Sequence, residues 1–273
     1  MERLRGALEK EEVKAQTRIS PTTLWRIETA VLRPRESTVI ALLNLYRADD
    51  ETRHHVLGLW EEAKDDGAPQ PFAPDLRDEY NAYIGIEAQA RTVCNYQSAF
   101  VPGLLQTEEY TRAVIHGVWP EATTSDAEQH VKARMERQGL LIKDDPLHLT
   151  AVIDEAALRR HVGGPQVMAE QMRQLRATAG QPHITLQVIP NTSGAHPGMP
   201  GAFALLTFPG ARDPEVVYIE SAASDLFLDK QPDVDRFTGT FKTLCKIALS
   251  PADSLALIAT IEHELTRDKE TPA

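Results

Sequence analysis

The stretch ISPTTLWRIETAVLRP, residues 19–34, predicts a short capped helix with one apolar face. Ser20 is a candidate N-cap, because its hydroxyl can accept a hydrogen bond from a backbone N–H of the first turn, and Pro21 suits the first helical position, where no donor is needed. Three apolar residues recur at helical spacing and are expected to face inward: Leu24, Ile27 and Val31. The outward face then holds Thr22, Trp25, Arg26 and Thr29.

Further helices and a linker are predicted after this stretch. Apolar residues recur at helical spacing over residues 39–46 and again over 56–60. The segment DDGAPQPFAPD, residues 65–75, contains three prolines, one glycine and three acidic residues without periodicity, which is typical of a linker. The sequence therefore predicts three parts: an all-helical module over residues 1–64, a linker over 65–79 and a second domain over 80–273.

Charge is distributed unevenly along the chain. Residues 1–64 hold 11 of the 29 Lys and Arg residues and 11 of the 40 Asp and Glu residues, so the remaining 18 basic and 29 acidic residues carry the whole formal charge of −11. Between residues 14 and 35 the only acidic residue is Glu28, and the basic residues are Lys14, Arg18, Arg26, Arg33 and Arg35. The quoted helix can therefore lie on a locally basic surface of an acidic protein.

Downstream of the linker, stretches of period two alternate with stretches of helical period. Strands are predicted at LHLTAVID, ITLQVIP, AFALLTF and VVYIE, with a further short strand at DLFLD. One helix is predicted to begin after Thr107, another follows the break at Gly163, Gly164 and Pro165, and two more lie on either side of Ser250 and Pro251. We therefore expect an α+β fold, in which the small helical module precedes a larger domain with a mainly antiparallel sheet.

Two local patterns refine this expectation. Ser125 is followed three residues later by Glu128, which predicts a capping box at the start of a helix that runs to about Ile142. The run VPGLLQT, residues 101–107, is interpreted as a strand that ends in a turn before a helix cap at Thr107. The same run could instead line an apolar groove.

Composition excludes several classes of protein. A hydrophobic content of 42% and a charged content of 25% are typical of globular domains. No apolar run reaches the ~18–20 residues of a membrane span, and the first residues, MERLRGALEKEE, lack an apolar export segment. We therefore expect a cytoplasmic protein. Cys94 and Cys245 are too few for a disulfide framework and are interpreted as small buried apolar residues.

Catalytic and metal-binding patterns are scarce. His54 and His55 are adjacent, so on a helix they would point about 100° apart and form a poor metal pair. The sequence contains no HExxH motif, Gly-rich phosphate loop or GxSxG motif. The acidic pairs at 65–66 and 144–145 adjoin Gly- or Pro-containing loops, where solvated carboxylates are routine. We expect no metal, no cofactor and no catalytic residue.

The loop NTSGAHPGMPG, residues 191–201, separates two predicted strands and contains three glycines and two prolines. It could form the lip of a ligand or peptide site, because loops held by a rigid sheet often carry function. It could also be a plain connection whose glycines and prolines set turns, and this is the simpler interpretation. The candidate ligand or partner residues in the second domain are Leu104, Tyr110, His196 and Met199.

The run VKAQTRISPTTLWRIETAVLRP, residues 13–34, resembles the second and third helices of XRE-type helix-turn-helix regulators. The match lies at Ala15, Ser20, Arg26, Ile27 and Glu28. The C-terminal two thirds is similar to the domain of uncharacterised function in actinobacterial regulators of this type, the WhiJ-like class, which includes antitoxin-like proteins. This similarity rests on YIGIEAQA, VPGLLQTEEYTRAV, RMERQ, HPGMPGAFALLTFP, VVYIE and ALSPADSLALI.

The resemblance implies a homodimer that reads a palindromic DNA operator. The third helix would lie in the major groove, with Ser20, Thr22, Thr23 and Trp25 on the side that meets the bases. The phosphates would be contacted by Arg26, Arg33 and Arg35. The resemblance also implies that the C-terminal domain binds an effector or a small partner protein encoded nearby.

Two alternatives come from different functional classes. In the first, Trp25 packs against another part of the protein or a partner, as tryptophans on helix faces often do, and the helical module no longer binds DNA. The C-terminal domain would then act alone as a small-molecule or protein binder. In the second, that domain is an enzyme acting on an apolar substrate, although no residue pattern supports a particular reaction.

Overall fold

The structure is a computed structural model, and it divides the chain into two compact units, Met1–Ile86 and Glu87–Ala273. The residues that it describes are 1–6, 8–19, 21–28, 34–65, 78–209, 215–221 and 225–267. The predicted linker over 65–79 falls largely on residues 66–77, which lie outside the described residues.

The N-terminal unit is helical throughout its described residues. Its helices are α1 (Glu2–Arg5), α2 (Lys10–Thr17), α3 (Pro21–Glu28), α4 (Glu36–Leu45), α5 (Asp50–Asp65) and α6 (Asp78–Gln89), within which the division between the units falls. The helices predicted from apolar spacing are confirmed as α3, α4 and α5. Leu24 and Ile27 pack with Val13 and Leu42 in one buried cluster, so their predicted inward orientation is also confirmed. Val31 lies outside the described residues.

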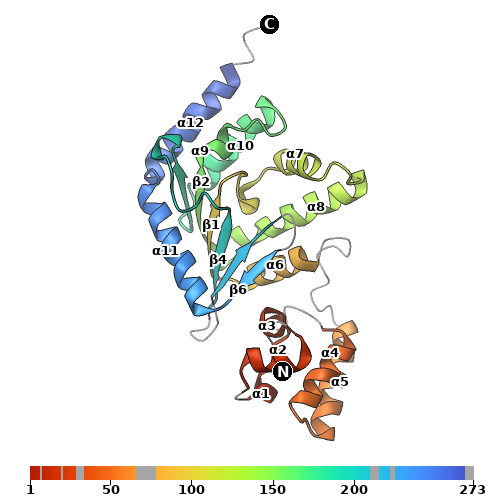
Figure 1. The fold of residues 1–273 in the computed structure, drawn as a ribbon. Coiled ribbons are helices and arrows are strands. Elements are labelled where there is room, and N and C mark those ends of the chain that lie inside the picture. Colours follow the sequence, from red (N-terminus) through yellow and green to blue (C-terminus); the bar gives the residue numbers. More distant parts are fainter. Residues whose placement is uncertain are drawn as a thin grey trace. The chain divides into compact units, whose positions relative to one another are not determined.

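The C-terminal unit is built on one six-stranded mixed sheet with the order β3-β2-β1-β4-β5-β6 (Figure 1). The strands are β1 (Thr92–Gln97), β2 (His148–Asp154), β3 (Ile184–Ile189), β4 (Phe203–Thr207), β5 (Val216–Ile219) and β6 (Leu226–Leu228). β1, β2 and β3 pair in parallel, whereas β4, β5 and β6 continue the sheet in antiparallel pairing. The predicted α+β class is confirmed, as are the five strands predicted at LHLTAVID, ITLQVIP, AFALLTF, VVYIE and DLFLD; the sequence patterns did not predict the central strand β1.

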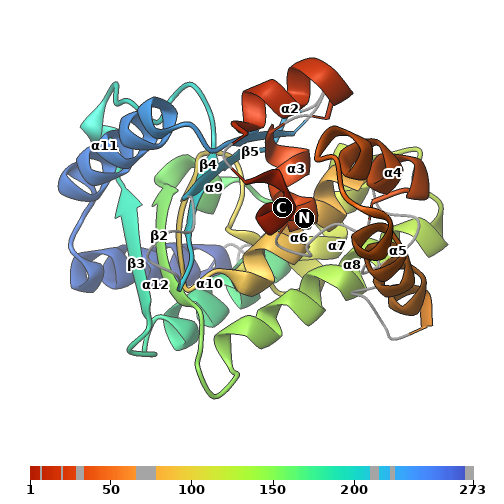
Figure 2. The same ribbon diagram turned by 90° about the horizontal axis from the view of Figure 1, so that it is seen from below.

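Helices lie on both sides of this sheet. The connections between the parallel strands contain α7 (Glu108–Val118), α8 (Thr124–Arg137), α9 (Glu155–Arg159) and α10 (Pro165–Thr178), and α11 (Gln231–Ile247) and α12 (Pro251–Arg267) follow β6. Figure 2 shows α11 on one side of the sheet and α7, α8 and α10 on the other. Of the helices that the structure describes, none alone is long and apolar enough to cross a membrane, and α11 and α12 pass that test only as a pair bent by 68°.

The sheet face beneath α11 carries a buried apolar cluster. It includes Tyr96 and Phe203 from neighbouring strands and Phe241 from α11. Phe203 lies at the centre of an aromatic row, with ring centroids 5.9 Å from Tyr96, 4.9 Å from Phe237 and 6.3 Å from Phe241. Aromatic contacts at these separations add to the stabilisation that burial provides. Aromatic contacts therefore contribute, with the aliphatic residues of the cluster, to the packing of α11 on the sheet.

Both cysteines pack against this apolar cluster as free thiols. Burial, and to a lesser extent the neighbouring Cys245 and Glu215, raises the pKa of Cys94 to about 11. Burial also raises the pKa of Cys245. A thiol with a raised pKa is protonated at neutral pH and behaves as a small apolar group, which agrees with the apolar character predicted for both cysteines, although both are only partly buried.

The predicted capping box at Ser125 was wrong by two residues. α8 is capped by Thr123, whose hydroxyl accepts from the Asp126 N–H at 3.2 Å while the Thr123 N–H donates to the Asp126 carboxylate at 3.0 Å. Glu128 does not reach back to the cap, because its carboxylate accepts from Arg112 Nε at 2.7 Å. A second Ser/Thr-x-x-acid pattern, displaced by two residues, therefore determines the start of the helix.

The strand predicted over VPGLLQT is also absent. Residues Gly103–Leu105 form a single 3₁₀ turn, η1, in which Leu104 and Leu105 are buried. Short apolar runs do not distinguish a buried strand from a buried turn, which explains the error. The predicted cap at Thr107 is confirmed, because its hydroxyl accepts from the Tyr110 N–H at 3.2 Å at the start of α7.

Candidate functional site

The N-terminal unit contains a helix-turn-helix segment in which α2 and α3 are separated by three residues. Arg18 ends α2 in the left-handed conformation, with φ 63° and ψ 8°, and its N–H donates to the Lys14 carbonyl at 2.8 Å. The Thr17 hydroxyl donates to the Val13 carbonyl at 2.7 Å and accepts from the Ile19 N–H at 3.2 Å. Because a left-handed conformation costs an L-residue ~1–2 kcal/mol, these surrounding bonds hold the chain in the turn.

α3 is attached to its unit along one face and at its C-terminal end. Leu24 is fully buried and Ile27 is 8% exposed. Glu28, the last residue of α3, is only 3% exposed and pairs with Arg5 Nε at 2.7 Å. α3 is therefore held rigidly, as a helix that positions side chains against a ligand must be.

The seven residues predicted to contact DNA are described to different extents. Ser20 and Arg33 lie outside the described residues. The structure places Thr22, Thr23, Trp25 and Arg26 on α3, and of these it describes only the Thr23 side chain, which is half-buried. Arg35 is exposed and lies immediately before α4. The structure thus brings four of the seven onto one helix.

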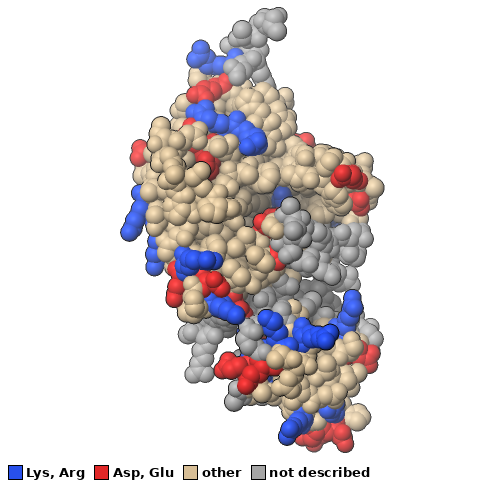
Figure 3. Space-filling model, viewed as in Figure 1, with Lys and Arg blue, Asp and Glu red and all other residues tan. Residues whose placement is uncertain are grey.

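The exposed charges of both units are of mixed sign. Figure 3 shows Lys and Arg side chains next to Asp and Glu side chains on the visible face of each unit. Near the turn between α2 and α3, Lys14 and Arg18 are both exposed. Exposed basic residues next to α3 are the kind of feature that contacts a phosphate backbone.

A second candidate site is a cavity of about 310 Å³ in the C-terminal unit. It lies where the three parallel strands end: Ser98 follows β1, Asp154 ends β2, and Pro190 and Asn191 follow β3. The 191–201 loop adds further lining residues, which are Gly194, His196 and Met199. Ligands of open parallel sheets bind at this carboxyl edge, so the position itself indicates a binding site.

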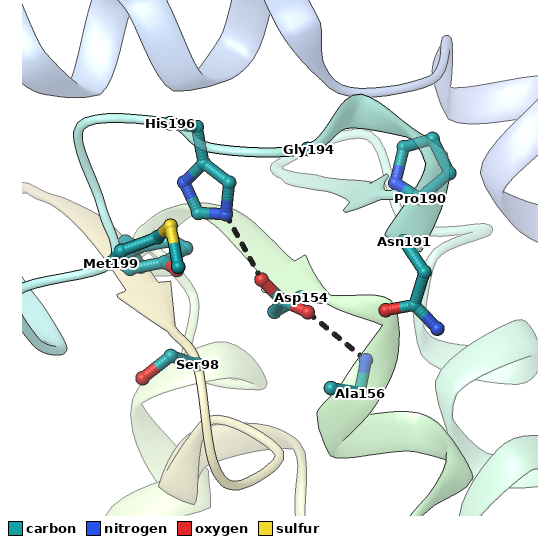
Figure 4. Close-up of a pocket in the computed structure, with 9 residues that line it drawn as sticks. Ser98, Asp154, Ala156, Pro190, Asn191, Gly194, His196 and Met199 are labelled. Carbon is teal, nitrogen blue, oxygen red and sulfur yellow. Dashed lines mark hydrogen bonds and ion pairs between the residues drawn. The ribbon is translucent and has the colours of Figure 1, made fainter.

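Asp154 is the polar centre of this cavity. One carboxylate oxygen lies 3.2 Å from His196 Nε2, and the other accepts from the Ala156 N–H at 3.0 Å, which caps α9 (Figure 4). The His196 side chain is only 5% exposed. Glu155 then fixes the edge of the cavity, because its carboxylate accepts from the Asn191 N–H at 2.8 Å and from Arg159 Nε at 2.6 Å.

Tyr96 forms the inner wall of the cavity and is fully buried. Burial, with a smaller contribution from Asp154, raises its pKa to about 12, so the phenol keeps its proton. Tyr96 Oη and His196 Nδ1 are buried and have no hydrogen-bond partner among the residues that the structure describes. An unpaired buried polar atom typically costs ~1–3 kcal/mol, and such atoms are uncommon in stable folds.

The four ligand residues predicted from sequence fall into two places. His196 and Met199 line the cavity together. Leu104 and Tyr110 are buried outside the cavity lining, and the Tyr110 hydroxyl accepts from the Val101 N–H at 3.1 Å. Sequence reasoning missed Tyr96 and Asp154, which the positions of the strand ends would have indicated had β1 been recognised.

The lining residues do not assemble a nucleophile. The Ser98 hydroxyl points away from both Asp154 and His196 (Figure 4), so it does not form the serine–histidine contact that activates such a group. Nor do the described residues bring together three His, Cys, Asp or Glu side chains that could hold a metal ion.

Comparison with known families finds two matches, one in each part of the chain. Residues 80–260 match the family described as Domain of unknown function (DUF5753), and residues 1–56 match a helix-turn-helix domain. No curated protein and no solved structure matches the chain.

Proposed function

This chain belongs to the DUF5753 family and carries an N-terminal helix-turn-helix domain, and from these premises we propose that it is an XRE-type transcriptional regulator. In this proposal the helical module over residues 1–64 reads a specific operator, the linker spans 65–79, and the domain over 80–273 mediates dimerisation and binds an effector or a small partner protein. The protein would act in the cytoplasm and belong to the actinobacterial, WhiJ-like class.

The way in which α3 is held is the observation that carries the proposal. Leu24 and Ile27 are buried and Glu28 is paired, so α3 is held through these residues, and we propose that its opposite face meets DNA. That face carries Thr22, Trp25 and Arg26 in the sequence. We propose that Thr22 and Thr23 approach the bases and that Arg26, with Arg33 and Arg35, contacts the phosphates.

The charge distribution supports a dimer that binds DNA through its N-terminal units. Residues 1–64 are neutral overall, whereas the rest of the chain carries the net charge of −11. Because screening limits the reach of charges to ~8–10 Å, an acidic domain held away from DNA does not oppose binding by a locally basic helix. Two-fold symmetry would then demand a palindromic operator.

Selection of fragments of the source genome by the purified full-length protein, at near-physiological salt, tests this function. We expect enrichment of one palindromic motif by the wild type and loss of enrichment by Arg26→Ala. Arg236→Ala is the matched control, because it removes the same charge from an exposed position on α11. The logarithm of the binding constant for the selected motif should fall linearly with the logarithm of the salt concentration, because phosphate contacts release counterions.

The proposal fails if no motif is enriched, or if Arg26→Ala enriches the motif as well as Arg236→Ala does. Sedimentation of the protein with and without the selected DNA tests the proposed homodimer. One dimer per palindrome is expected, and a monomer on a single half-site would exclude the homodimer.

A further inference from the structure

We propose that the cavity at the carboxyl ends of β1, β2 and β3 binds a small uncharged molecule through a hydroxyl or carboxamide group that pairs with Tyr96 and His196. The 191–201 loop would serve as the lid of this site. This cavity would be the site of the effector in the proposed function. An effect of the bound molecule on DNA binding rests on that function, whereas binding of the molecule itself does not.

Topology places the cavity where ligands bind to sheets of this kind. From β1 the chain moves outward through β2 to β3, and it then returns to the other side of β1 as β4. The 191–201 loop makes this return, and Tyr96 near the end of β1 lies opposite Phe203 at the start of β4. The strand order therefore reverses at β1, and a crevice forms at such a reversal.

His196 supplies the hydrogen-bond acceptor of the proposed site. A carboxylate can only accept hydrogen bonds, so in the 3.2 Å contact with Asp154 the donor is His196 Nε2. In the neutral imidazole Nδ1 is then an acceptor, and it has no partner among the described residues. A ligand that donates one hydrogen bond would satisfy it.

Tyr96 supplies the hydrogen-bond donor of the proposed site. Its hydroxyl remains protonated at neutral pH, because burial raises its pKa to about 12, and within the described part of the chain nothing accepts its proton. The rings of Tyr96 and His196 meet edge to face with centroids 6.1 Å apart, so the two polar groups belong to one small region. A hydroxyl or a carboxamide can accept from Tyr96 and donate to His196 with the same functional group.

The remaining lining residues restrict the charge and size of the ligand. No Lys or Arg is among the lining residues, and the carboxylate of Asp154 is already engaged. An anionic ligand would therefore lack a counter-charge, whereas the Tyr96 ring, Pro190 and Met199 offer apolar contact. A volume of about 310 Å³ lies at the lower end of the range for small-molecule sites.

The 191–201 loop closes this region from solvent. Gly198 lies directly on the Tyr96 ring, since an added Cβ would be 2.6 Å from Tyr96 Cζ and 3.0 Å from its hydroxyl oxygen. Met199, the next residue, is 65% exposed at the rim and lines the cavity. A ligand that reaches the Tyr96 hydroxyl must therefore displace Gly198, while His196 of the same loop stays bonded to Asp154.

Binding of benzyl alcohol and benzamide to the full-length protein tests the inference, with benzoate as the anionic counterpart. Saturation-transfer NMR titrations should detect both neutral probes and show benzoate binding at least about tenfold more weakly. Tyr96→Phe keeps the ring and removes the donor, and His196→Gln keeps a donor for Asp154 but replaces the ring acceptor Nδ1 by an amide oxygen at a different position. Each should weaken binding about threefold to tenfold, the usual effect of one hydrogen bond.

Tyr110→Phe is the matched control, because Tyr110 is equally buried but outside the cavity lining, and its binding should equal that of the wild type. The inference is overturned if benzoate binds as well as benzyl alcohol, if neither Tyr96→Phe nor His196→Gln weakens binding, or if no neutral probe binds. The assay contains no DNA, so failure of the proposed operator binding leaves its result unchanged, and the converse also holds.

Discussion

Arg5 and Glu28 join the first helix of the chain to the last residue of α3. Arg5 Nε lies 2.7 Å from Glu28 Oε1, and the two side chains are 15% and 3% exposed. The same guanidinium donates from Nη1 to the Leu8 carbonyl at 2.6 Å. Arg5 is therefore bonded within the N-terminal unit, where it fixes the C-terminal end of α3, the helix proposed to contact the bases.

Arg5→Ala should destabilise the N-terminal unit by about 3 kcal/mol, because it leaves the Glu28 carboxylate buried without its partner. Urea unfolding of the full chain, followed by circular dichroism, measures this change. Lys132→Ala is the control, since Lys132 is 77% exposed and lies 3.8 Å from Glu136, and it should change stability by less than about 0.5 kcal/mol. Equal effects of the two substitutions would show that the Arg5 pair is not structural.

Gly198→Ala should destabilise the C-terminal unit by about 1–3 kcal/mol. The added Cβ would lie 2.6 Å from Tyr96 Cζ, and the ring cannot retreat because Phe203 packs behind it. The loop must therefore shift. Gly139→Ala is the control, because no atom lies within 4 Å of its Cβ position. Unfolding curves of the two variants should differ, and coincident curves would mean that the loop adapts without strain.

Native Cys94 and Cys245 should resist thiol reagents at pH 8. Burial raises the pKa of both, and a value of about 11 for Cys94, against 9.0 for an ordinary thiol, reduces its thiolate fraction about a hundredfold. Reaction with a chromogenic disulfide should therefore be slow in buffer and rapid in denaturant. Fast reaction of either thiol in the native protein would contradict the packing of α11 on the sheet.

Acid should destabilise the C-terminal unit through Glu155. Burial alone would raise the pKa of this carboxyl, but the bonds from the Asn191 N–H and Arg159 outweigh it and lower the pKa below 4.5. A group whose pKa is lowered by folding stabilises the protein above its unfolded-state pKa, and that stabilisation is lost as pH falls through the folded-state value. Stability should thus decline below about pH 4.5.

Glu155→Gln should flatten this decline, whereas Glu136→Gln, at an exposed pair on α8, should leave it unchanged. Thermal melts between pH 3 and pH 7 provide the comparison. Parallel pH profiles for the wild type and both variants would assign the acid transition to other carboxyl groups.

Much of the fold was predictable because its signals are local. Leu24 and Ile27 recur at helical spacing, and Thr107 and Ser250 cap helices with their own hydroxyls, so no distant residue is needed to recognise them. β1 was missed because its residues TVCNYQ place polar side chains between buried ones. Their burial depends on two neighbouring strands, which lie more than fifty residues along the chain.

The cavity was predictable only in part for the same reason. His196 and Met199 belong to one distinctive loop, so a single stretch of sequence identifies both. Tyr96 and Asp154 join them only when β1 and β2 lie side by side with a definite register, in which Gln97 pairs with Ile153. A register of this kind is a property of the folded sheet, and sequence spacing does not contain it.

The aromatic row beneath α11 ends at the cavity wall. Tyr96 contacts His196 of the loop on one side and Phe203 on the other, and Phe203 contacts Phe237 of α11. The Tyr96 ring therefore has two roles: it lines the cavity, and it belongs to the aromatic row on which α11 packs. A bound molecule that displaced the Tyr96 ring would therefore press on Phe203 and, through it, on α11, so we expect ligand binding to be felt at this helix.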